Sequence, residues 1–171
     1  MKAKPARPRA PTNGKDGQPR ERSYGTNRRA LYEYHILETI EVGIALMGTE
    51  VKSVRASRVN LREAYARVER GELWLYGAHI STYEAGSRYN HEPTRPRKLL
   101  AHTREIARLA GRASEPGATL VPLRIYDRHG HVKVQLAVAK GKHSYDKREA
   151  IAAREARREI ERAVKRDLVG R

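Results

Sequence analysis

The sequence predicts a mainly β protein, built as a small β-barrel with two short helices and a basic extension at each end. Residues 32–48, 63–83 and 118–140 are rich in β-branched, aromatic and alternating apolar residues, which is typical of short strands. The first 29 residues hold four of the eight prolines and show no hydrophobic periodicity, which predicts a disordered arm. The last 31 residues carry ten Lys or Arg and six acidic residues, and they have little apolar surface to bury.

The first long apolar stretch, YEYHILETIEVGIALMG (32–48), predicts a single strand. Gly43 interrupts this stretch, so we expect a bulge or a sharp bend there. The next segment, residues 49–59, has valines near helical spacing. It predicts a short helix, with Thr49 as a possible N-cap.

The middle of the chain predicts two strands, a loop and a second helix. Residues 63–83 read as two strands around a tight ERGE turn. Residues 85–98 are rich in Gly, Asn and Pro, which favours a loop. Residues 102–113 predict a helix that begins near Thr103 and turns Ile106, Leu109 and Ala110 toward the core.

The last strands form a predicted hairpin, residues 118–140, around the turn Asp-Arg-His-Gly. With no phenylalanine and one tryptophan, the core must consist mainly of Val, Ile, Leu, Ala and Tyr. Short strands with two helices favour a closed or partly open barrel of the OB-fold kind. We therefore divide the chain into an arm (1–26), a barrel (27–140) and a tail (141–171).

The charge of the chain predicts its class of partner. Lys and Arg number 36 against 20 Asp and Glu, which gives a net charge of +16. Such a protein is attracted to polyanions, and nucleic acid is the polyanion we expect, because each neutralised phosphate releases counterions. No stretch has the roughly 18 apolar residues that a membrane span needs, and the N-terminus has no hydrophobic signal segment. We expect a cytoplasmic protein that does not bind membranes.

Catalytic patterns are weak in this sequence. His129 and His131 flank a glycine and could both face a metal, but no third ligand is placed. Glu41 could act as a general base, although a solvent-facing role is more common for a strand carboxylate. The nucleotide-binding, hydrolase and metalloprotease motifs are absent. We therefore expect no catalytic site, no metal and no cofactor.

A basic cluster lies in HEPTRPRKLL (91–100), where Arg95, Arg97 and Lys98 precede two leucines. It could form a phosphate-binding edge beside an apolar anchor, or a solubilising loop that enters a helix. The tyrosines could stack on unpaired bases, but most of them are expected in the core. Tyr145 is the exception, because it lies outside the predicted barrel among lysines.

Three blocks of the sequence resemble the SsrA-binding protein family, also called small protein B. They are NRRALYEYHILETIEVGIALMGTEVKSVRASRVNL (27–61), PTRPRKLL (93–100) and VAKGKHSYDKREAI (138–151). The resemblance implies an OB-like barrel and a C-terminal tail that is unstructured in solution. It also implies a monomeric, non-enzymatic adaptor that binds transfer-messenger RNA and takes it to ribosomes stalled on messages without a stop codon.

The matched motifs imply RNA-binding roles for Asn27, Glu41 and Leu100, with the neighbouring Arg28. A carboxylate cannot pair with a phosphate, so Glu41 would accept hydrogen bonds from base amino groups or 2′-hydroxyls, or orient a nearby arginine. The full set of predicted RNA-binding residues is Asn27, Arg28, Glu41, Arg95, Arg97, Lys98, Leu100, Lys140 and Lys142.

The tail carries the predicted ribosome contacts. The block KGKHSYDKR assigns this role by resemblance to Asp146, Lys147 and Arg148, next to Tyr145. Beyond it, Ile160 and Val164 continue a thin apolar stripe in a segment of strong helix formers. We expect the tail to become helical in the decoding centre and message channel of the small ribosomal subunit. Two alternatives stay open: a general ribosome-associated RNA chaperone, and an RNA-processing enzyme.

Overall fold

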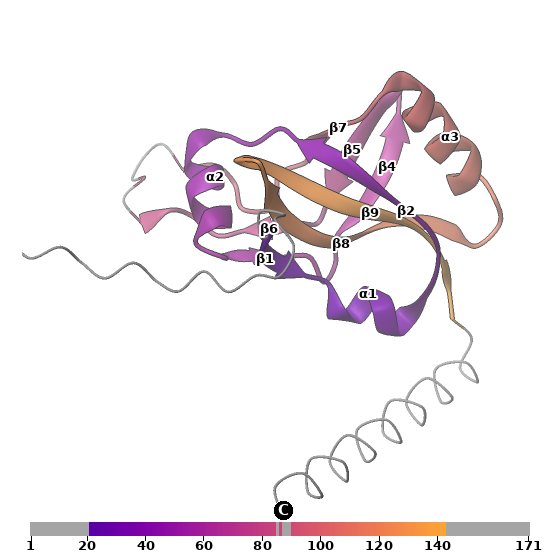
Figure 1. Cartoon of the computed structure of the whole chain (residues 1–171), viewed down its shortest axis with the longest axis horizontal. Helices are drawn as coiled ribbons and strands as arrows, with labels where there is room; N and C mark the ends of the chain where they lie inside the picture. Colours follow the sequence, from indigo (N-terminus) through magenta and orange to yellow (C-terminus); the bar gives the residue numbers. More distant parts are fainter. Residues whose placement is uncertain (1–20, 85, 87–89, 143–171) are drawn as a thin grey trace, which may run out of the picture.

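The computed structural model describes residues 21–84, 86 and 90–142 (Figure 1). Its helices are α1 (Arg28–Glu33), α2 (Gly48–Arg55) and α3 (Thr103–Ala113). Its strands are β1 (Arg22–Thr26), β2 (Tyr34–Ile44), β3 (Val59–Asn60), β4 (Tyr65–Glu69), β5 (Glu72–Tyr76), β6 (His79–Ile80), β7 (Arg97–Leu100), β8 (Ala118–Arg128) and β9 (His131–Gly141). The predicted mainly β class is confirmed.

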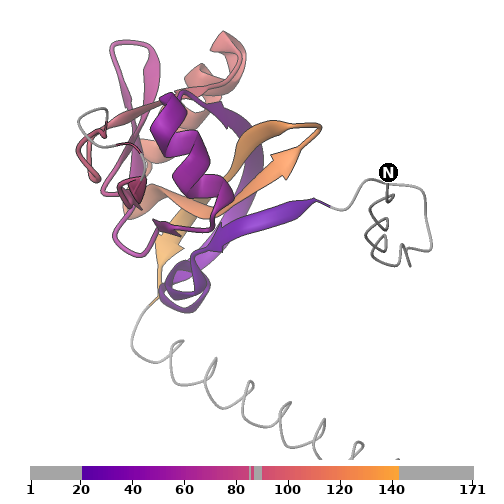
Figure 2. The same ribbon diagram turned by 90° about the vertical axis from the view of Figure 1, so that its left-hand side faces the viewer.

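The main sheet has seven strands and closes on itself. Its order is β1-β8-β4-β5-β7-β2-β9, and β9 also pairs with β8, so every strand except β1 belongs to a ring. The shortest strand pairing in the ring is the one between β4 and β8, where Ala66 and Leu120 are the one pair of residues in register. Strands β3 and β6 form a separate two-stranded sheet. Helix α2 lies across one side of the ring, and α3 lies over another (Figures 1 and 2).

The described part of the chain has three helices rather than the two that were predicted. Helix α1 begins after Asn27, whose side-chain oxygen accepts a hydrogen bond from the Ala30 amide nitrogen at 3.0 Å. Residues 32 and 33 therefore lie in α1, and the strand predicted from residue 32 begins at Tyr34. A six-residue helix has too short an apolar period to stand out from a neighbouring strand in the sequence.

The other two helices are confirmed, although α2 ends at Arg55 and Val59 begins β3, but their predicted N-caps are wrong. Helix α2 is capped at Met47, whose amide donates to the Glu50 carboxylate at 2.8 Å. Helix α3 is capped at His102, whose amide donates to Glu105 at 2.9 Å. In each case a glutamate at the third helical position accepts from the amide of the N-cap residue, and each predicted cap, Thr49 and Thr103, lies inside its helix.

Gly43 does not mark the predicted bulge. The register of β2 against β9 runs without a break through Gly43, and the irregularity lies between Ile36 and Glu38. Gly43 is opposite Leu100 of β7, and a Cβ atom added to it would lie 3.1 Å from the Leu100 Cβ. The glycine therefore allows the close approach of β7. Strand β7 begins at Arg97, inside the segment 85–98 that was predicted to be a loop.

The folded part also begins earlier than predicted. Strand β1 pairs with β8 from Arg22 onward, and Tyr24 is buried in the core, so residues 22–26 belong to the sheet and not to an arm. Residues 1–20 and 143–171 lie outside the described residues, so the rest of the predicted arm and the tail remain predictions. Among the residues described, no helix is both long and apolar enough to cross a membrane.

Both predicted hairpin turns are confirmed. Arg70 and Gly71 have φ values of 50° and 77°, and His129 and Gly130 have values of 52° and 79°. Two successive residues in the left-handed region make the turn type that fits the twist of a hairpin. The core inside the ring consists mainly of aliphatic side chains, as expected. Its largest fully buried members include Leu73, Leu75, Leu99, Leu109, Leu120, Ile125 and Leu136.

Candidate nucleic-acid interface

The outer face of β2, β9 and β8 carries a compact group of polar side chains. Val42, Ile125 and Val134 point into the core, so the residues that alternate with them point outward. Across the three strands Glu41 is opposite Gln135, and Gln135 is opposite Arg124. We call this group the Glu41 surface; it comprises Glu41, Arg124, Tyr126, Arg128, Lys133 and Gln135.

Glu41 reaches across β9 to two side chains of β8. The Tyr126 hydroxyl and the Arg128 guanidinium both donate to the same carboxylate oxygen, Oε2, and the Arg128 bond is 2.8 Å long. The Glu41 side chain is 30% exposed and that of Arg128 is 50% exposed. The guanidinium is thus more open to solvent than the carboxylate that holds it.

The pKa values on this surface follow from the same contacts. The hydrogen bond from Tyr126 lowers the pKa of Glu41, burial opposes this, and Arg128 and Lys133 lower it further. Burial and the bond to Glu41 raise the pKa of Tyr126 to about 12. At neutral pH the carboxylate is therefore charged and the tyrosine hydroxyl keeps the proton that it donates.

Arg124 covers the other side of Tyr126. Its guanidinium carbon lies 4.2 Å from the centre of the tyrosine ring, a cation–π distance. Its Nε donates to Gln135 at 2.7 Å, and its Nη2 lies 3.1 Å from Glu21. These contacts explain why Tyr126 is 2% exposed although it points away from the core.

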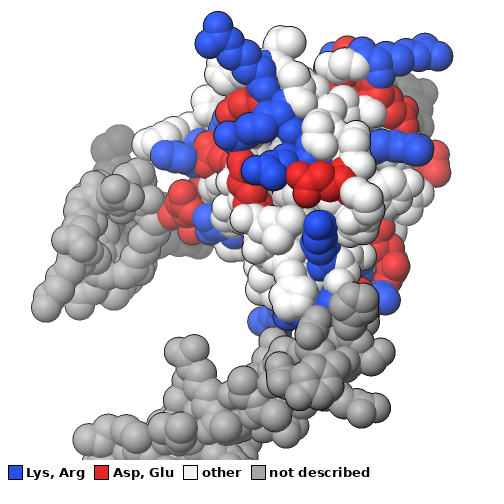
Figure 3. Space-filling model, turned by 90° about the vertical axis from the view of Figure 1, so that its right-hand side faces the viewer, with Lys and Arg blue, Asp and Glu red and all other residues white. Residues whose placement is uncertain are grey.

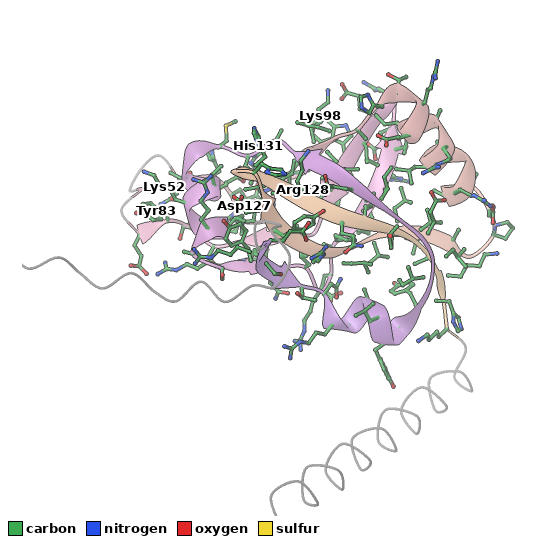
Figure 4. All side chains as sticks on the ribbon, in the orientation of Figure 1. Lys52, Tyr83, Lys98, Asp127, Arg128 and His131 are labelled. Carbon is green, nitrogen blue, oxygen red and sulfur yellow. The ribbon has the colours of Figure 1, made fainter. Side chains whose placement is uncertain are left out.

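A groove of about 260 Å³ opens beside the Glu41 surface, between α2, β7 and the β8–β9 turn. Its apolar lining includes Gly43 and Leu100, and Arg55 and Lys133 lie at its border. Leu100 is 52% exposed, so its apolar surface at this groove is open to solvent. Figure 4 places Arg128, Asp127 and His131 around the β8–β9 turn. Leu100 is opposite Gly43, which lies two residues beyond Glu41 on β2, so the predicted site residues Glu41 and Leu100 lie near one another.

Replacing Tyr126 by Phe should raise the pKa of Glu41 toward its ordinary value, because the largest cause of its lowering is removed. A carboxylate with a lowered pKa stabilises the fold above its ordinary pKa, and the contribution is lost as pH falls through the lowered one. Tyr126→Phe should thus cost about 1–2 kcal/mol at pH 7 and less at acid pH. Urea unfolding of both proteins at pH 7 and at a pH below the lowered pKa of Glu41 measures the difference in the free energy of unfolding. An equal loss of stability at the two pH values would contradict the prediction.

Within the basic cluster at the start of β7, Arg97 lies in the interior and not at a phosphate-binding edge. Arg97 is completely buried; its guanidinium bonds Glu50 at 2.9 Å and the carbonyl oxygens of Ala78 and Pro93. Arg95 bonds Glu50 at 2.9 Å and is 25% exposed. Burial alone would raise the pKa of Glu50, but the bonds from Arg95 and the Met47 amide and the charge of Arg97 lower it.

A direct RNA contact by Arg97 does not fit this burial, since the guanidinium has no path to solvent. Through its bond to Glu50, the Arg97 side chain connects β7 to α2 in the protein interior. Lys98 points outward and pairs with Glu72, with its side chain 42% exposed. Of the three basic residues in the cluster, Arg95 and Lys98 keep an exposed part that could meet a phosphate.

Asn27 also proves to be an interior residue, with 2% exposure. Its amide group donates to the Leu61 carbonyl at 2.8 Å and the Pro122 carbonyl at 3.2 Å, while its oxygen caps α1. Strand β8 has a register irregularity between Pro122 and Arg124, so Asn27 holds the bulge that precedes the Glu41 surface. A role in RNA binding would therefore pass through the position of β8 and not through direct contact.

Three other predicted residues lie at the opposite end of β2 and β9. Arg28 is exposed at the start of α1. Lys142 donates from its backbone to Glu33 at 2.8 Å and from its ammonium to the Leu31 carbonyl at 3.2 Å. Lys140 lies 3.9 Å from Glu115. These cations surround the point where the chain leaves β9, and the structure does not bring them to the Glu41 surface.

The face over α3 is not a strong candidate for RNA. Figure 3 shows Lys and Arg interspersed with Asp and Glu on that side. Arg108 pairs with Glu38 at 2.6 Å, and Arg112 pairs with Glu115 at 3.0 Å. Paired charges of both signs give this face a small net field for a polyanion.

The predicted tail residues Tyr145, Asp146, Lys147, Arg148, Ile160 and Val164 lie outside the described residues. Conversely, the sequence reasoning missed Arg124, Arg128 and Lys133 as site residues. The signal that could have found them is alternation, because residues 124, 126 and 128 share a face opposite to that of buried Ile125.

Known proteins are similar to this chain in sequence. The sequence model of the family described as SmpB protein matches residues 24–166. The SsrA-binding protein of Carboxydothermus hydrogenoformans is 59% identical over 145 residues, which cover 85% of this chain and 97% of that protein. The SsrA-binding protein of Pelotomaculum thermopropionicum is 59% identical over 139 residues, covering 81% and 91%.

A solved structure is similar as well. It is described as "tmRNA-SmpB: a journey to the center of the bacterial ribosome", and the matching chain is 50% identical with a TM-score of 0.61. The match covers 74% of this chain and 92% of that one. Sequence and fold thus agree over nearly the whole of these relatives, and the resemblance seen in the three motif blocks is confirmed: the chain belongs to the SmpB protein family.

Proposed function

We propose that this protein is an RNA-binding adaptor, not an enzyme, that binds transfer-messenger RNA and delivers it to stalled ribosomes in trans-translation. The observation that carries the proposal is the 59% identity to proteins named SsrA-binding protein, over nearly their whole length. The solved relative described with tmRNA and the bacterial ribosome supports the same pair of partners.

The Glu41 surface supports the RNA part of this proposal. It presents Arg124, Arg128 and Lys133 beside the groove that contains the exposed Leu100. Guanidinium and ammonium groups bind phosphates, and an exposed apolar side chain gives an unstacked base a surface to pack against. We assign transfer-messenger RNA to this face.

The division of labour along the chain is part of the proposal. The ring of strands would hold the RNA. Gly141 belongs to β9 and Lys142 is bonded to α1, so the part of the predicted tail that would enter the decoding centre and message channel of the small subunit is residues 143–171. Tyr145 and Asp146-Lys147-Arg148 would lie at the entry, and the apolar stripe through Ile160 and Val164 would lie on a helix in the channel. A channel without message has room for this segment, so the tail would report that the message has run out.

Leu100→Asp should weaken binding to isolated transfer-messenger RNA at least tenfold, and Glu41→Lys should weaken it a few-fold. The first places a negative charge beside phosphates, and the second breaks the arrangement of Tyr126 and Arg128. Filter binding or fluorescence anisotropy measures the affinity, and circular dichroism checks the fold. The matched control is Leu37→Asp, because Leu37 is 54% exposed on the same sheet and is not part of the groove.

A structured RNA of equal length serves as the competitor. The proposal requires that the unaltered protein prefer transfer-messenger RNA over it. Equal affinity for both RNAs would point to a general RNA chaperone, and normal binding by both folded site variants would remove Glu41 and Leu100 from the interface.

A further inference from the structure

We propose that Glu41 does not contact RNA itself but positions Arg128, whose guanidinium makes the phosphate contact of this surface. This inference rests on the proposed function, because it names the group by which the Glu41 surface holds its RNA. It concerns three side chains on two strands: Glu41 of β2, and Tyr126 and Arg128 of β8.

The chemistry of the carboxylate is the first reason. A charged Glu41 repels phosphate, so its presence in an RNA interface requires a partner. The structure supplies two partners from the protein, since Tyr126 and Arg128 both donate to Oε2. The carboxylate also lies deeper than the arginine, with 30% of its side chain exposed against 50%. The group that the RNA meets first is the guanidinium.

The geometry of Arg128 is the second reason. Arg128 is the last residue of β8, immediately before the turn, where a long side chain is free to take many rotamers. The 2.8 Å bond from Nη1 to Glu41 fixes one of them. A guanidinium has five donors, and one bond to Glu41 leaves an edge for a phosphate. Because the side chain is already held in place before RNA binds, the loss of side-chain entropy on binding is smaller.

The role of Tyr126 is the third reason. Its hydroxyl bonds the carboxylate that holds Arg128, and its ring is covered by Arg124 at 4.2 Å. The tyrosine and the arginine therefore hold the same carboxylate oxygen of Glu41. The three side chains form a chain of contacts from the buried ring to the exposed guanidinium, and only its last member faces a polyanion.

A double-mutant cycle tests the inference with Glu41→Met, which keeps the side-chain length, and Arg128→Met, which keeps an unbranched apolar stem; both substitutions remove the charge. Arg128→Met should weaken binding to transfer-messenger RNA about tenfold, and should reduce the slope of log affinity against log salt by about 1. Glu41→Met alone should weaken binding a few-fold, although it removes a negative charge that repels RNA. In the Arg128→Met background, Glu41→Met should cause no further loss of RNA affinity. A gain in affinity also agrees with the inference, because without Arg128 the remaining effect of Glu41 is its repulsion of phosphate.

Two further variants make the result specific. Arg128→Lys keeps the charge but not the planar fork, so it should keep the salt slope and recover part of the affinity. Arg104→Met removes one exposed cation from α3, on another side of the molecule, and should change affinity less than twofold. Circular dichroism melting checks that every variant is folded.

The outcomes separate the two levels of the proposal. If Glu41→Met weakens binding equally with and without Arg128, Glu41 contacts the RNA itself and the inference is wrong. Wild-type affinity and salt slope in Arg128→Met would also overturn it. If the unaltered protein binds transfer-messenger RNA no better than a structured control RNA, the proposed function fails, and this inference fails with it.

Discussion

Replacing Glu50 by Ala should lower the free energy of unfolding by about 3–5 kcal/mol. The substitution leaves the guanidinium of Arg97, which has no exposed surface, without the carboxylate that neutralises it. It also removes the partner of Arg95 and the acceptor of the Met47 amide at the start of α2. Urea unfolding at neutral pH, where Glu50 is charged, measures the change.

The matched control is Glu72→Ala, which breaks the ion pair with Lys98 on the outside of the sheet. The side chains of this ion pair are both more than 40% exposed, so the loss in the free energy of unfolding should stay below about 1 kcal/mol. An equally small loss in Glu50→Ala would mean that Arg97 finds another acceptor or reaches water. A double variant, Glu50→Leu with Arg97→Met, should recover much of the stability, because no unpaired charge is left inside.

Ending the chain after Lys142 should leave the affinity for isolated transfer-messenger RNA within about twofold and abolish tagging of stalled nascent chains. The reason is the proposed separation of roles, in which the ring holds RNA and the tail enters the message channel. Lys142 itself is tied to α1 by two hydrogen bonds, so the truncated chain keeps the end of β9 in place. A reconstituted translation reaction with a message that lacks a stop codon measures tagging.

A full-length variant with a scrambled tail separates charge from sequence. If the same residues 143–171 in another order restore tagging, net positive charge alone explains the role of the tail. We expect no restoration, because the order sets Tyr145 and Asp146-Lys147-Arg148 at the entry and aligns Ile160 with Val164. Wild-type tagging by the truncated protein would contradict the whole mechanism of the tail.

The long strands and the two hairpins could be predicted from the sequence because each has a local signal. Alternating apolar residues predicted β8 and β9, and glycines within short polar turns predicted the reversals at residues 70–71 and 129–130. The short elements could not be found in this way. Helix α1 and strand β7 depend on partners distant in sequence, such as the bonds from Asn27 to Leu61 and Pro122, and the pairing of Leu99 with Leu73.

Residues of the candidate site could be selected from the sequence, but their exposure could not. Motif resemblance selected Glu41 and Leu100, which the fold brings close together, and Asn27, which the fold buries; the basic cluster added Arg97, which is buried as well. A motif records that a residue type recurs and does not say whether it faces solvent or neighbours within the protein. Arg97 could be distinguished from Arg95 and Lys98 only once Glu50, 47 positions earlier, was known to lie beside it.

Strand β9 has a mechanical consequence for a protein whose chain continues beyond it. It is bonded along its length to β2 on one side and to β8 on the other. Tension applied at Lys142 along the strand therefore loads both ladders in shear, so that many hydrogen bonds must break together. By contrast, β1 is a five-residue edge strand with β8 as its one partner in the sheet, and a pull at Arg22 can peel it away bond by bond. The chain beyond β9 is thus anchored where the fold best resists force, so a load on it moves the ring as one rigid body.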